Sequence, residues 1–111
     1  MPLKSPAQSL PISLPQSAII EFCQQWQITE LALFGSVLRD DFRPNSDIDM
    51  LVTFSLEAQW SLLDLVKMEY SLEDLLHRKV DLVMKTSIEQ SHNWIRRQEI
   101  LGTAQIIYEQ G

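Results

Sequence analysis

The pair Gly35-Ser36, followed after ten residues by Asp47-Ile48-Asp49, is the feature that most constrains the fold of this chain. The second half of this pattern runs directly into the apolar stretch MLVTF, which is typical of a buried strand. Residues i and i+2 of a strand point to the same side. We therefore expect Asp47 and Asp49 to project together, whereas Ile48 faces a core on the other side.

The chemistry of this pattern follows from its two halves. Carboxylates held side by side repel each other, and Mg²⁺ is commonly held by one or two carboxylates together with substrate phosphates. A glycine followed by a small hydroxyl residue, opening a short helix, presents backbone N–H groups and an O–H to an anion. Alone, a Gly-Ser step is usually a turn, and an Asp-x-Asp is usually a loop or a helix cap. Together, at this spacing, they indicate phosphoryl or nucleotidyl transfer.

A third carboxylate, Asp81, lies inside the short apolar run KVDLVM. Burying an unpaired charge in the middle of a strand is costly, so Asp81 is expected on the face opposite Val80 and Leu82. There it is either an exposed residue on a solvated sheet face or a neighbour of Asp47 and Asp49. Three clustered carboxylates would suit two Mg²⁺ ions.

Composition excludes several classes of function. A chain of 111 residues has room for one small domain with one core. The net charge of −6 argues against binding to a nucleic-acid backbone, and it fits a site whose negative charges are offset by metal. The single cysteine, Cys23, excludes an internal disulfide and lies on an apolar helical pattern, which favours a buried thiol. No apolar run approaches the roughly 18 residues of a membrane span, so a cytoplasmic location is expected.

The hydrophobic pattern predicts an α+β fold. We expect residues 1–14 to form a flexible arm and residues 15–111 to form the domain. Its predicted elements, in order, are a helix to residue 26, a strand at 28–34, a short helix at 37–41, a strand at 48–54, a helix at 61–77, a strand at 79–84 and a final helix at 87–109. A small mixed β-sheet of three or more strands, with helices packed on one face, accommodates this order. The other face would stay open and carry the carboxylates.

At these residues the chain resembles the nucleotidyltransferase superfamily of the DNA polymerase β type, and it is most similar to the minimal nucleotidyltransferase (MNT) group. The pattern of that group, GS, ten residues, DxD and a later strand Asp, matches Gly35, Ser36, Asp47, Asp49 and Asp81 without a gap. The surrounding segment ALFGSVLRDDFRPNSDIDMLVTF and the tail NWIRRQEILGTAQIIYE also resemble the group. The likeness extends over roughly residues 17–109.

The resemblance implies a role for each motif residue. Gly35 and Ser36 would hold the triphosphate of a bound nucleotide. Asp47 and Asp49 would ligate two Mg²⁺ ions that bridge the triphosphate. Asp81 would complete one metal site and help to deprotonate the attacking hydroxyl.

Three basic residues near the motif are weaker candidates. Arg39 lies three residues beyond Ser36 on the same helical face, and relatives often carry an arginine there. It would either contact the phosphates or form an ion pair with a neighbouring aspartate. Arg43 is a lesser candidate for the phosphates, and so is Lys85, which we expect in solvent.

The resemblance also implies a partner. MNT proteins are similar to the antitoxin half of two-component modules whose other half is a HEPN-domain protein, often a ribonuclease toxin. The implied reaction transfers AMP from ATP to a tyrosine hydroxyl of that toxin within a hetero-oligomer. Little polypeptide follows the motif residues, so we expect the acceptor to come from another macromolecule or from a second copy of the chain.

Two alternatives remain open. In the first, the protein is a non-catalytic binding module that inhibits its partner by occlusion, using exposed apolar groups such as Trp60 or Trp94, although core packing is the simpler role for both. In the second, it modifies a small molecule such as an aminoglycoside, which the lack of an acceptor domain disfavours. The three acidic motif residues favour the enzyme, because a pure binding surface has no need of clustered carboxylates.

Overall fold

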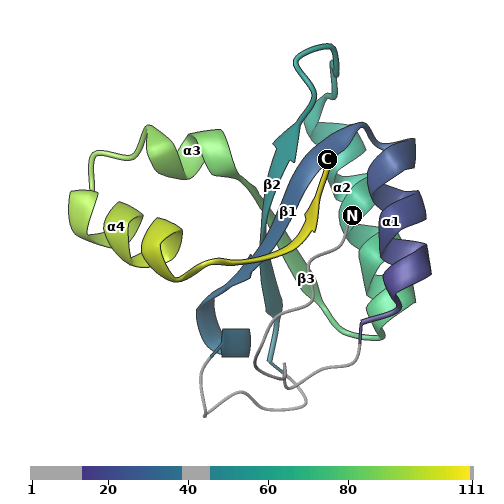
Figure 1. Ribbon diagram of the computed structural model, residues 1–111, viewed down its shortest axis with the longest axis horizontal. Helices are drawn as coiled ribbons and strands as arrows, with labels where there is room; N and C mark the ends of the chain where they lie inside the picture. The colour runs from purple at the N-terminus through teal and green to yellow at the C-terminus, as the bar shows by residue number, and fades with distance from the viewer. Residues whose placement is uncertain (1–13, 39–45, 111) are drawn as a thin grey trace.

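Helices and strands alternate along most of the chain, and two helices follow one another before the last strand (Figure 1). The structure, a computed structural model, describes residues 14–38 and 46–110, so the predicted N-terminal arm lies outside the described residues except for Leu14. The elements are α1 (Gln16–Gln25), β1 (Ile28–Phe34), the 3₁₀ helix η1 (Gly35–Leu38), β2 (Ile48–Phe54), α2 (Leu62–Leu76), β3 (Val80–Met84), α3 (Lys85–Glu89), α4 (Trp94–Thr103) and β4 (Gln105–Glu109). Strands β1 and β2 have the bounds that the apolar runs predicted.

The strands form one mixed sheet in the order β3-β2-β1-β4. Strand β1 pairs antiparallel with both β2 and β4, whereas β2 and β3 are parallel. Parallel neighbours cannot be joined by a tight turn, and helix α2 provides the crossover between them. The predicted α+β fold with a small mixed sheet is therefore confirmed.

The main core lies between one face of the sheet and helices α1 and α2, which stand together on one side of the sheet in Figure 1. Inward-facing residues alternate along the strands, as expected for one buried face. The buried members of this core include Ile19, Phe22, Cys23, Ile28, Leu31, Leu33, Ile48, Met50, Val52, Met68, Leu72, Val80, Leu82, Ile107 and Tyr108. Cys23 is fully buried among them, as its apolar surroundings in the sequence indicated.

The opposite face of the sheet is not left open, which corrects the expectation that helices pack on one face only. Ala32 and Phe34 of β1 and Leu51 of β2 form a second apolar cluster with Ile88 of α3 and Ile100 of α4. Figure 1 shows α3 and α4 on the side of the sheet away from α1 and α2. The sheet residues of this cluster alternate with those of the main core, so both faces of β1 and β2 bury apolar side chains.

The C-terminal segment is also different from the prediction of one helix over residues 87–109. Helix α3 already begins at Lys85, and a second start follows at Asn93, whose Oδ1 accepts the Arg96 N–H at 3.1 Å and caps α4. Helix α4 ends at Thr103, and the next residues form β4. Trp94, for which core packing was the simpler role, is 57% exposed, and its neighbour Ile95 is 61% exposed.

Strand β3 is an edge strand whose outward backbone groups are satisfied by the helix that precedes it. The Leu82 N–H donates to Glu69 Oε2 at 2.8 Å, and the Val80 N–H donates to Glu73 Oε2 at 3.2 Å. The carboxylate of Glu69 thus reaches from α2 to the strand. The Ser61–Asp64 capping box begins this helix. None of the helices in the described ranges has the length and apolar character needed to cross a membrane.

Candidate active site

Gly35 connects the end of β1 to the candidate site. Its φ of +79° lies in the left-handed region that favours glycine. A Cβ at this position would collide with Oδ2 of Asp49 and would lie 3.3 Å from its Cγ. Phe34, the residue before Gly35, is the register partner of Asp49 across the β1–β2 pair. The backbone of the glycine therefore lies directly against the carboxylate of Asp49, and no other residue leaves this space free.

Asp49 and Asp81 are direct partners in the parallel pairing of β2 with β3. The residues that flank them, Ile48, Met50, Val80 and Leu82, are buried in the main core. Because strand side chains alternate, both aspartates project to the opposite face. Each is the second residue of its strand, so they lie at the same end of the sheet. The sequence left open whether these two strands are neighbours, and the structure shows that they are.

Asp47 lies immediately before β2 and is exposed, as is Asp81, whereas Asp49 is half-buried. Among the side chains of residues 14–38 and 46–110, no three acidic, histidine or cysteine groups gather closely enough to hold a metal ion. The structure thus places Asp49 and Asp81 in register and Asp47 two positions away along the chain. Ser36 follows Gly35 in η1, but its side chain lies outside the described part, and Arg39 and Arg43 fall there too.

A cavity of about 430 Å³ opens where β1 ends and β2 begins, and neither Asp47 nor Asp81 is among its described lining residues. Gly35 and Asp49 form part of its wall, and helix α4 forms another part. The lining residues are Phe34, Gly35, Leu38, Asp49, Arg96, Glu99, Ile100 and Thr103. The four residues of α4 recur at i, i+3, i+4 and i+7, which places them on one face of the helix.

The contribution of α4 to this cavity was missed by sequence reasoning. The segment was predicted as part of one long helix, and none of its polar residues was named as a site residue. In α4, Ile100 is buried and Leu101 packs partly buried against the second cluster. Three polar residues, Arg96, Glu99 and Thr103, share the helix face of Ile100. Polar side chains at helical spacing around a single apolar residue were the available signal for a helix that lines a site.

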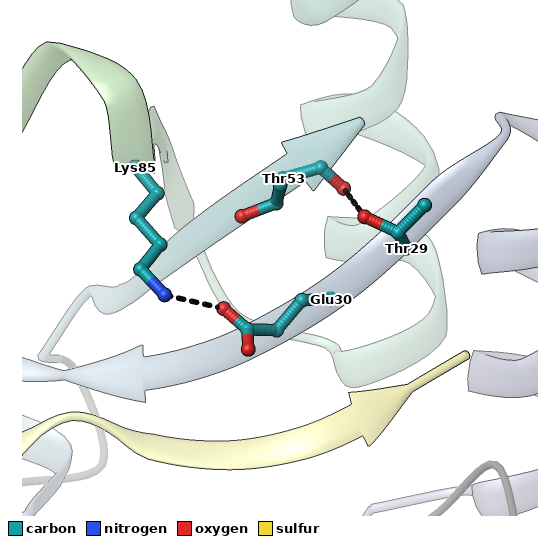
Figure 2. A network of polar contacts seen from close by, with 4 residues as sticks. All are labelled: Thr29, Glu30, Thr53 and Lys85. Carbon is teal, nitrogen blue, oxygen red and sulfur yellow. Dashed lines mark hydrogen bonds and ion pairs between the residues drawn. The ribbon is translucent and has the colours of Figure 1, made fainter. Parts of the chain in front are cut away.

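Lys85 is engaged away from the candidate site. Its Nζ lies 2.9 Å from Glu30 Oε1, and this hydrogen bond raises the pKa of Lys85 above its ordinary value. Figure 2 shows the pair next to a second contact, in which the Thr29 hydroxyl donates to the Thr53 carbonyl at 3.2 Å. Lys85 follows the last residue of β3, whereas Asp81 is near the first. It is therefore held by an ion pair at the other end of the strands.

Comparison with known proteins agrees with this geometry. The model of the family described as "Nucleotidyltransferase domain" matches residues 17–107. The chain belongs to the nucleotidyltransferase domain family, and the resemblance seen in its sequence is confirmed. The fold supports the same classification, because the family motif falls at the strand ends where Gly35, Asp49 and Asp81 meet.

Individual proteins resemble the chain in sequence or in fold. The protein adenylyltransferase MntA of Thermococcus cleftensis is 41% identical over 69 residues, which are 62% of this chain and 68% of that protein. A solved chain assigned as a minimal nucleotidyltransferase superposes with a TM-score of 0.61 at 30% identity, covering 80% of this chain and 85% of that one. A chain from a toxin–antitoxin crystal structure with AMP-PNP superposes with a TM-score of 0.65 at 20% identity, covering 86% of this chain and 74% of that one. This similarity shows that the two chains share a fold.

Proposed function

We propose that this nucleotidyltransferase is an antitoxin that transfers AMP from ATP to a tyrosine hydroxyl of a HEPN-domain toxin. The observation that supports transfer is the direct register of Asp49 with Asp81 beside the backbone of Gly35. The choice of AMP and of a protein acceptor is supported by the name of the Thermococcus cleftensis relative, a protein adenylyltransferase. The toxin partner is supported by the toxin–antitoxin structures that share the fold.

The residues at the strand ends fit a magnesium-dependent reaction. Asp47, Asp49 and Asp81 offer only carboxylate oxygens, which are the ligands Mg²⁺ prefers. The absence of a Cβ at Gly35 leaves backbone in contact with the Asp49 carboxylate, so an anion approaching the glycine also approaches the acidic group. In the described residues these aspartates do not close into a three-ligand metal group by themselves, so we propose that phosphate oxygens of the nucleotide supply the remaining ligands of two Mg²⁺ ions. When bound, they would neutralise the charge of the triphosphate and of the oxygens around the reacting phosphorus.

The chain's own residues position the reactants and accept a proton. Gly35 and Ser36 hold the triphosphate through backbone groups at the start of η1. The acceptor oxygen forms a bond to the α-phosphorus, while the bond from that phosphorus to the oxygen bridging to the β-phosphorus breaks. Pyrophosphate leaves with the bonding electrons. Asp81 accepts the proton of the hydroxyl and passes it to solvent.

One observation favours a second candidate, a non-catalytic module that inhibits its partner by occlusion. Trp94 and Ile95, at the start of α4, are 57% and 61% exposed and precede Arg96, which lines the cavity. Exposed large apolar residues of this kind are common in protein interfaces. Occlusion alone would need no aligned aspartates, so the two candidates differ in their dependence on Asp47 and Asp49.

Label transfer from α-labelled ATP separates these candidates. The purified protein would be incubated with Mg²⁺, α-labelled ATP and a lysate of the source cell. Asp47→Asn and Asp49→Asn each remove a carboxylate charge at nearly constant volume, and Asp74→Asn on the exposed side of α2 is the matched control. We expect a labelled protein band with wild type and with Asp74→Asn. With either site variant the band should carry at least about 100-fold less label.

Two results would contradict the proposal. Labelling at the wild-type rate by Asp47→Asn or Asp49→Asn would show that the acidic residues do not hold the metal. No labelling by wild type, with the partner still captured by wild type and by both variants, would establish the occluding module instead. Mass spectrometry of a labelled band would identify the acceptor residue, and a modified residue other than tyrosine would refute that part of the proposal.

A further inference from the structure

We infer that Arg96 of α4 binds the phosphate chain of the nucleotide, an inference that rests on the proposed nucleotidyl transfer. Arg96 lines the cavity together with Gly35 and Asp49. Of the described residues that form its wall, Arg96 is the basic one, while Asp49 and Glu99 are acidic. The positively charged protein group available to a triphosphate in this cavity therefore lies on α4, in a different part of the cavity wall from Gly35 and Asp49.

The position of Arg96 in its helix does not serve the stability of that helix. Arg96 and Arg97 lie in the first turn of α4, where the helix dipole disfavours positive charge. The guanidinium of Arg97 has a hydrogen-bond acceptor within the protein, because its Nη1 donates to the Ser91 carbonyl at 2.8 Å. Within residues 14–38 and 46–110, the guanidinium of Arg96 has no hydrogen-bond or ion-pair partner. An exposed arginine facing a cavity without such a partner is available to a ligand.

The chemistry of the guanidinium favours a phosphate as that ligand. Its planar donors bind two phosphate oxygens at once, and it remains charged at any pH at which the protein is folded. The neighbouring α4 residues on the cavity, Glu99 and Thr103, are acidic and neutral, and the Thr103 hydroxyl donates to the Glu99 carbonyl at 2.6 Å. Arg96 is thus the α4 side chain suited to an anion. A tyrosine hydroxyl of an acceptor protein, by contrast, carries no charge for it to neutralise.

Calorimetric binding of Mg²⁺·ATP and Mg²⁺·AMP provides the test. Arg96→Gln and the matched variant Arg97→Gln each remove one positive charge from adjacent positions of the same helix. We expect Arg96→Gln to weaken ATP binding by about tenfold or more, and AMP binding by less than threefold, because the arginine acts on the β- and γ-phosphates. Arg96→Lys should recover part of the affinity. Arg97→Gln should bind both nucleotides as wild type does.

Steady-state transfer gives a second readout that a structural role would not produce. Arg96→Gln should raise the KM for ATP while leaving the KM for the acceptor protein unchanged. Its unfolding temperature without nucleotide should be no lower than that of wild type, because the helix dipole disfavours the charge that is removed. Equal ATP affinity in Arg96→Gln and Arg97→Gln would overturn the inference. So would an equal loss for ATP and AMP, or a change confined to the acceptor KM. If wild type itself binds no ATP, the proposed function fails first, and the inference fails with it.

Discussion

Gly35 is the residue at which backbone conformation and the candidate site are most directly linked. Its positive φ and its contact with Asp49 impose two separate requirements, and glycine meets both. Gly102 in α4 is the opposite case, since a Cβ there would meet nothing within 4 Å. The two glycines provide a matched pair for one substitution.

We predict opposite effects for Gly35→Ala and Gly102→Ala. Alanine at position 35 must adopt a left-handed conformation, at a cost of about 1–2 kcal/mol, and must displace the Asp49 carboxylate. Its free energy of unfolding should fall, and AMP transfer should fall with it. Alanine at position 102 should raise the free energy of unfolding by up to about 1 kcal/mol, because alanine is the better helix former, without changing transfer. Urea denaturation measures the free energy of unfolding, and label transfer measures the activity. Unchanged transfer by Gly35→Ala would show that the glycine is not needed at the site.

At the scale of elements, α2 holds β3 in place through two carboxylates as well as through its apolar face. We predict that Glu69→Ala lowers the free energy of unfolding by about 1–3 kcal/mol, because it leaves the Leu82 N–H without its acceptor. Glu69→Gln retains an acceptor oxygen and should lose less. Urea denaturation of both variants beside wild type tests this. If Glu69→Ala is as stable as wild type, packing alone holds the strand.

The elements that the sequence predicted well are those with a strong local pattern. Strands β1 and β2 are bounded by apolar runs and turn residues, and the alternation around Asp81 correctly assigned its face. Strand β4 was missed because its extended conformation depends on pairing with β1, where Ala32 opposes Ile106 and Leu31 opposes Tyr108. Such pairing is not visible in a short window of sequence.

The same distinction applies to the candidate site. Motif and alternation placed Asp49 and Asp81 on predictable strands, but they left open whether those strands are neighbours, and the register of the two residues is known only from the structure. The cavity wall of α4 did not follow, because it depends on how Ile88 and Ile100 pack against Ala32, Phe34 and Leu51. Tertiary packing of this kind determines which polar residues of a helix face a ligand.

At the scale of the whole molecule, ligand binding should appear as global stability. A ligand that binds only the folded state at 100 times its Kd stabilises that state by about 2.7 kcal/mol. We predict a rise in the melting temperature of wild type with saturating Mg²⁺ and ATP, and a smaller rise with Mg²⁺ alone, as carboxylate repulsion is relieved. EDTA should reverse both. Asp49→Asn should lose these shifts, whereas Asp74→Asn should keep them; an undiminished shift in Asp49→Asn would place the metal elsewhere.

The crossover from β2 through α2 to β3 affects the stage of folding at which the candidate site forms. Asp49 and Asp81 are distant in the chain and become neighbours only when this parallel pair has closed. Such nonlocal pairing carries the loop-closure entropy that makes strand association slow. We therefore expect a newly synthesised chain to form the local turn at Gly35 before it pairs Asp49 with Asp81. Nucleotidyl transfer would then report completed folding, because a half-folded copy lacks the paired carboxylates that the proposed reaction requires.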